Sequence, residues 1–204
     1  MAFTDYKNLT ILKAKHPQII VKSERFIPEL ERITHLGNDD YVSENILLSL
    51  QTYQSNEFYI EENLVSPVLR YVWQNMYFKD MNMWTHQEIE YDTDLSGTPD
   101  YMFTLLDQEQ YQILSYPIFM IIESVEYDFV EGWAQCIAQM LACQKLNNNP
   151  NVIIFGIVTT GKQWEFAKLE ANIITKNEFG CDIYSLEELV AILDFLLGEA
   201  KKQL

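Results

Sequence analysis

The spacing of apolar residues changes along the chain, and the changes mark different kinds of element. Residues 56–78 place apolar side chains at helical spacing, which predicts a helix that Pro67 divides or kinks. The apolar period then shortens to two, as in strands whose side chains alternate between two faces. This shorter period predicts three strands, at His86–Asp92, Asp100–Leu106 and Pro117–Ser124.

The second half of the chain alternates between helical and strand patterns. One side of the segment from Asp128 to about Leu146 is apolar, which predicts an amphipathic helix. Val152–Thr159 is almost wholly apolar, as expected for a buried strand beside a crossover helix. A fifth strand is expected over Trp164–Leu169 and a last helix over Ser185–Leu197. This order predicts an α/β fold, an α/β/α sandwich around a mixed five-stranded central sheet.

The length of the chain fits one compact domain. Its 204 residues, 48% of them in the hydrophobic class, are enough to build a sizeable core. We expect a single domain over residues 1–204, in which residues 55–204 form the core. Residues 1–54, where short apolar groups mix with charges and prolines, are expected to form an N-terminal helical annex.

The charge is strongly acidic and unevenly distributed. There are 14 basic and 30 acidic residues, and the formal net charge is −16. This balance disfavours a non-specific nucleic-acid binder and a polybasic membrane-surface protein, because both need a basic surface. No lysine or arginine occurs from Asp80 to Gln144, although this segment holds twelve acidic residues. The pattern leaves open acidic loops around a strand-rich core, a cation site, or a partner with a basic surface.

The cysteines and the apolar runs indicate the compartment. Cys136, Cys143 and Cys181 form no metal-spaced pair and are odd in number, which fits a reduced, cytoplasmic environment. Ile118–Ile122 and Val152–Val158 are far too short to span a bilayer. We therefore expect a cytoplasmic protein that does not enter the membrane.

Three carboxylates stand where this order of elements could bring them together. Asp100 begins the second predicted strand, and Glu123 lies near the end of the third. Glu62, or its neighbour Glu61, lies on the preceding helix. Hard cations such as Mg²⁺ or Mn²⁺ are bound by a few carboxylates together with water and substrate phosphate. These residues are therefore candidates for a metal site.

The same residues form part of a longer series of short motifs. Pro99-Asp100 is followed after 23 positions by Glu123-Ser124-Val125, and then by a helix that contains Gln135. Over roughly residues 57–170 this series resembles the PD-(D/E)XK nuclease superfamily, which has the restriction-endonuclease-like fold. Three stretches are similar to uncharacterised bacterial members: Glu131-Gly132-Trp133-Ala134-Gln135, Phe155-Gly156-Ile157-Val158-Thr159 and Gly161-Lys162-Gln163-Trp164-Glu165-Phe166.

The resemblance implies a role for each of these residues. Asp100 and Glu123 would ligate Mg²⁺ or Mn²⁺, and the backbone carbonyl of Ser124 would assist. Glu62 would be an outer or second ligand. Gln135 would flank the site from its helix.

One position departs from the family pattern. The family's lysine should lie two residues after the glutamate, on the same face of the strand, but this position is Val125 and the next residue is Glu126. Lysine or arginine could come only from outside the cation-free segment, and the candidates are Arg70, Lys79 and Lys162.

The missing lysine shapes the functional expectation. We expect a nuclease-like protein with a degenerate site, weak or absent nuclease activity and a role as a binding or regulatory module. One alternative is an active Mg²⁺-dependent DNA or RNA endonuclease with a relocated lysine or arginine. Another is an acidic scaffold that binds a basic protein partner. The sequence leaves open whether the protein is an enzyme and whether it forms a homodimer.

Overall fold

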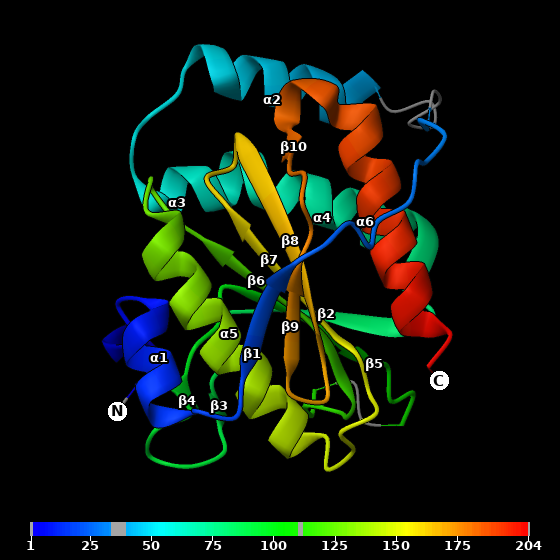
Figure 1. Ribbon diagram of the computed structural model, residues 1–204. Helices are drawn as coiled ribbons and strands as arrows, with labels where there is room; N and C mark the ends of the chain where they lie inside the picture. Colours follow the sequence, from blue (N-terminus) through cyan, green and yellow to red (C-terminus); the bar gives the residue numbers. More distant parts are fainter. Residues whose placement is uncertain (1, 34–39, 110–111, 204) are drawn as a thin grey trace.

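The computed structural model describes residues 2–33, 40–109 and 112–203, and its centre is a twisted sheet covered by helices (Figure 1). The sheet has eight strands in the described residues, rather than the five predicted. Seven follow one another in the order β1 (Ile20–Ser23), β9 (Ile173–Lys176), β8 (Gln163–Glu170), β7 (Ile154–Thr159), β6 (Ile118–Ser124), β5 (Tyr101–Leu105) and β2 (Met81–Thr85). The eighth, β10 (Cys181–Asp182), pairs with β8.

The sheet is mixed, as predicted. β6 and β7 run parallel and are connected through a helix, and β1 runs parallel to β9. The other neighbouring pairs are antiparallel. The four strands predicted from residue 100 onward correspond to β5, β6, β7 and β8, so the apolar pattern located them correctly.

The strand predicted over His86–Asp92 is present only at Ile89–Glu90, and it does not pair with β5. The strand that pairs with β5 is β2, which ends at Thr85, directly before His86. His86 has a φ of 48°, a left-handed conformation that does not continue a strand. Beyond it, β3 (Ile89–Glu90) and β4 (Ser96–Gly97) form a separate two-stranded sheet.

Helix α5 (Phe129–Leu146) covers one face of the sheet, over β6 and β7. It begins where expected because the Asp128 carboxylate accepts hydrogen bonds from the N–H groups of Val130 and Glu131. Gly132 lets the helix approach the sheet closely, beside Val125 and Val158.

The other face is covered by α6 (Leu186–Lys201) and by a long helical run. The run consists of α3 (Glu57–Ile60), η2 (Glu61–Val65), α4 (Ser66–Val72) and η3 (Trp73–Tyr77), in which η2 and η3 are wider π-helical turns. It matches the helix predicted over residues 56–78, and Pro67 lies in the first turn of α4. The helix α2 (Asp40–Gln51) packs against this run.

The N-terminal region is not wholly helical. It holds η1 (Phe3–Asp5), α1 (Leu9–Lys15) and α2, but it also supplies the edge strand β1. η1 and α1 pack against α5 (Figure 1). Buried side chains such as Phe3, Tyr6 and Leu12 belong to the same hydrophobic core as the central strands. Among the described residues, no helix combines the length and the apolar character that a membrane crossing requires.

The close approach of α5 to the sheet can be tested with Gly132→Ala. A Cβ at this position would lie 2.7 Å from Val125 Cγ1 and 2.8 Å from Val158 Cγ1. Both neighbours are β-branched and stiff, so we expect a loss of about 1–3 kcal/mol in the free energy of unfolding, measured in urea. The control is Gly198→Ala in α6, where the nearest atom is the Tyr77 hydroxyl at 3.3 Å. Unchanged stability in Gly132→Ala would show that the helix can move away from the sheet.

Candidate metal centre

The site begins where β5 and β6 meet. The antiparallel register pairs Tyr101 with Ile122, so Asp100 lies beside the last residues of β6. The Asp100 side chain is held there by Ser124, whose N–H lies 2.6 Å and whose Oγ lies 2.7 Å from Asp100 Oδ2. Asp100 is only 8% exposed. A buried carboxylate is thus fixed by two donors of one residue.

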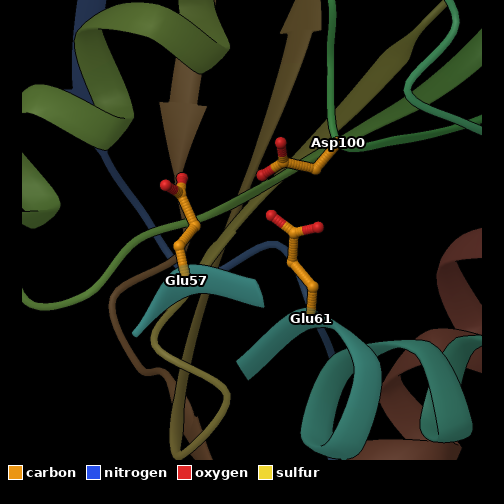
Figure 2. A group of neighbouring side chains, drawn as sticks. All are labelled: Glu57, Glu61 and Asp100. Carbon is orange, nitrogen blue, oxygen red and sulfur yellow. The ribbon is translucent and has the colours of Figure 1, made fainter. Parts of the chain in front are cut away.

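The helical run adds two more carboxylates. Asn56 caps α3 by accepting a hydrogen bond from Tyr59 N–H, and Glu57 and Glu61 then lie one turn apart. Ser124 Oγ lies 3.1 Å from Glu61 Oε1 and can donate its one proton to Glu61 or to Asp100. Figure 2 shows the carboxylates of Glu61 and Asp100 turned toward each other, with Glu57 beside them. One oxygen from each of the three lies within 4.8 Å of the others.

His86 also belongs to this site, although its sequence context predicts no role for it. Its Nε2 lies 2.9 Å from Glu61 Oε2, and its backbone N–H donates to the Asp100 carbonyl at 2.9 Å. The left-handed backbone described above turns the ring toward Glu61 instead of continuing β2. One signal could have found it, because His86 is the sole histidine in the segment that lacks lysine and arginine.

Burial disfavours the ionised form of the carboxylates in this cluster. The pKa of Asp100 is raised to about 6, mainly because of desolvation and also by the charge of Glu61, while the hydrogen bond from Ser124 N–H opposes the rise. Burial also raises the pKa of Glu61 and of Glu57. The donor set consists of carboxylate oxygens, the ligands that Mg²⁺ and Mn²⁺ prefer. These residues therefore fit a hard divalent cation, which would offset their charge.

Glu123 lies on the other face of β6. Because side chains alternate along a strand, Ser124 faces the helical run while Glu123 faces α5, where Gln139 Nε2 donates to its carboxylate. Burial raises the pKa of Glu123 well above its ordinary value, and the nearby charge of Asp100 adds to this rise. Among the described residues, the three carboxylates whose oxygens lie within 4.8 Å of one another include that of Asp100 but not that of Glu123. Glu123 thus underlies the site, and its role as a ligand stays a prediction.

The other predicted site residues are Glu62, Ser124 and Gln135, and they make different contacts. Glu62 is exposed and lines a separate pocket with Arg70, so Glu61 is the member of this pair that faces the site. Ser124 contacts the carboxylates through its N–H and hydroxyl. Gln135 donates to Glu131 at 2.8 Å, and Gln139, one turn later in α5, is the glutamine that contacts Glu123.

A cleft of about 580 Å³ opens beside the cluster, and Glu57, Ser124 and Val125 are among its lining residues. Lys7 also lines it, and Lys7 Nζ lies 2.6 Å from Glu131 Oε1. No sequence motif points to Lys7, because it lies in the N-terminal region, far along the chain from Glu57 and Val125.

The three cations considered from the sequence make other contacts. Lys162 Nζ lies 3.4 Å from the centre of the Tyr53 ring, and Lys79 Nζ lies 5.5 Å from that of Phe78. Arg70 Nε donates to Ser66 Oγ. Among the described residues, one side chain forms an ion pair with a carboxylate of the cluster, and it is that of His86.

No protein-family model matches the chain, and no curated protein matches it.

Ionisation of the buried Asp100 carboxylate destabilises the fold, so Asp100→Asn should stabilise the protein in a pH-dependent way. The folded-state pKa of about 6 exceeds the ordinary value of 3.8, so ionisation of Asp100 opposes folding. The cost is absent below about pH 3.8, grows as the pH rises to 6, and stays constant above that value. At pH 8, in EDTA, we expect Asp100→Asn to raise the free energy of unfolding by up to about 3 kcal/mol. Thermal unfolding at pH 4 and pH 8 measures this difference.

The exposed Glu62 on the neighbouring helical run supplies the control, and Glu62→Gln should change stability little at either pH. A gain in Asp100→Asn that is equal at pH 4 and pH 8 would contradict the assignment of the effect to the buried charge.

Proposed function

We propose that this chain is a divalent-cation-binding protein of nuclease-like design in which phosphodiester hydrolysis is weak or absent. One observation carries the proposal: Glu57, Glu61 and Asp100 converge beside a cleft that is lined by Val125, where the resemblance calls for lysine. The cofactor would be Mg²⁺ or Mn²⁺.

The residues around the cluster have positioning roles in this proposal. Glu57, Glu61 and Asp100 would hold the cation. A bound cation of this kind acts as a Lewis acid that polarises a phosphoryl oxygen. Ser124 fixes the Asp100 carboxylate, and His86 fixes that of Glu61. Gln139 orients Glu123 beneath the site. Fixed ligands of this kind lower the entropic cost of binding an ion.

Weak hydrolysis follows from the charges. An ammonium group positions water and offsets the negative charge that develops on phosphorus, and help of this kind is worth roughly 10²–10⁴ in rate. Val125 cannot supply it. Glu126 and Asp128 also line the cleft and would repel a phosphodiester.

A second candidate, an active Mg²⁺-dependent DNA or RNA endonuclease, is favoured by one observation. Lys7 lines the same cleft as Glu57 and Val125 and could take the place of the absent lysine. Its ammonium group is bound to Glu131, which lowers its availability to a substrate phosphate. The first candidate is therefore preferred.

Cation binding is tested by calorimetry with Mn²⁺ on wild type, Glu61→Gln and Glu62→Gln. These neighbouring residues form a matched pair, because only Glu61 faces the cluster. We expect Glu61→Gln to weaken Mn²⁺ binding by at least about tenfold, as for changes at or next to metal ligands, and Glu62→Gln to change it less than twofold. Equal affinities in all three proteins would overturn the proposed cation site.

The reason for weak hydrolysis is tested with Val125→Lys. Val125 lines the cleft beside the cluster, so a lysine there would bring an ammonium group into this cleft. In Mn²⁺, with single- and double-stranded DNA and RNA, we expect Val125→Lys to raise cleavage at least about tenfold over wild type. Val125→Met, similar in length and uncharged, should give no gain.

Strong cleavage by the wild type that disappears in Lys7→Met would reverse the preference between the two candidates. No gain in a folded Val125→Lys protein that still binds Mn²⁺ would also count against the proposal.

A further inference from the structure

Two exposed aromatic side chains flank the cleft beside the metal centre. Phe58 is 77% exposed and Tyr127 is 79% exposed, the two highest values among the large apolar side chains of the described residues. Both line the cleft, Phe58 from α3 and Tyr127 from the loop between β6 and α5. Single exposed aromatics are common on protein surfaces, but two around one cleft mark a binding surface.

The charges around these aromatic side chains are negative. Glu57, Glu126 and Asp128 line the cleft, and in the described part of the chain none of the three forms an ion pair with lysine or arginine. Within the described ranges, the basic side chain that lines the cleft is that of Lys7, and it is already paired with Glu131. A ligand of this surface would therefore meet aromatic faces together with carboxylates that form no ion pair with lysine or arginine among the described residues.

We propose that this cleft docks an arginine-bearing segment of a basic protein partner. A guanidinium group is planar, stacks on aromatic faces and forms paired hydrogen bonds with a carboxylate, so it matches both features of the surface. Its positive charge complements Glu126 and Asp128, which lie outside the three-carboxylate cluster. A nucleic acid would bring phosphates toward the same carboxylates, which disfavours it.

This inference goes beyond the proposed function and does not depend on the cation. The aromatic side chains and Glu126 would remain available in EDTA. Glu57 belongs both to the three-carboxylate cluster and to the lining of the cleft. Mn²⁺ should therefore weaken peptide binding only if an arginine of the peptide contacts Glu57. Binding of the two ligands can thus be measured separately.

The probe is a fluorescently labelled peptide of alternating arginine and glycine, titrated with the full chain in EDTA and followed by anisotropy. The matched peptide carries citrulline, which keeps the shape of arginine and removes its charge. We expect the arginine peptide to bind and the citrulline peptide to bind at least about tenfold more weakly, because each lost charge contact weakens the complex. Phe58→Ala and Tyr127→Ala should each weaken binding by about 2- to 30-fold, the range of cation–π contacts.

Two aromatic side chains elsewhere supply the controls. Phe179 is 63% exposed and Tyr184 is 69% exposed, and neither lines this cleft. Phe179→Ala and Tyr184→Ala should leave the affinity within twofold of wild type.

Three results would overturn the inference: equal binding of the citrulline peptide, equal losses in the control variants, or tighter binding of a single-stranded oligonucleotide that requires Phe58 and Tyr127. The calorimetry with Mn²⁺ separates the two proposals. Peptide binding without Mn²⁺ binding leaves this inference standing and removes the proposed function, and the reverse result removes this inference alone.

Discussion

The hydrogen bonds of Ser124 determine the geometry of the site. Its N–H and hydroxyl hold Asp100 at the junction of β5 and β6, and the hydroxyl also reaches Glu61 on the helical run. The next side chain along β6, Glu123, must point to the other face of the sheet. Ser124 thus connects two strands and a helix, and the alternation along β6 places Glu123 on the opposite face from Asp100 and Glu61.

Most of the central fold could be predicted from local patterns. The strands from Asp100 onward and the helix after Asp128 were located because a fully buried strand and a capped amphipathic helix leave strong signals. The edge strand β1 and its neighbour β9 were missed for a physical reason. β1 and β9 are four residues each, and their pairing joins Ile20 to Ile173 across most of the chain, which no local period records.

The candidate site was predicted less completely. Asp100, a candidate from the sequence, is a member of the cluster. The choice between Glu61 and Glu62 depends on helical phase, and the π-helical turn η2 begins at Glu61. A wider turn changes the angle between successive side chains, so regular helical spacing cannot settle which residue faces inward. His86 and Lys7 reach the site through backbone conformation and tertiary packing, which single-sequence patterns do not contain.

The parallel pairing of β1 with β9 bears on the order of assembly during synthesis. Strands β5, β6 and β7 with helix α5 come from one continuous stretch, so they can associate as soon as residue 159 has emerged. The first strand of the chain must wait until Lys176 is available before it gains its hydrogen-bonding partner. A newly made chain therefore carries the apolar residues Ile20 and Val21 without their partner strand until β9 has been made. Such delayed pairing slows folding and exposes the nascent chain to wrong associations.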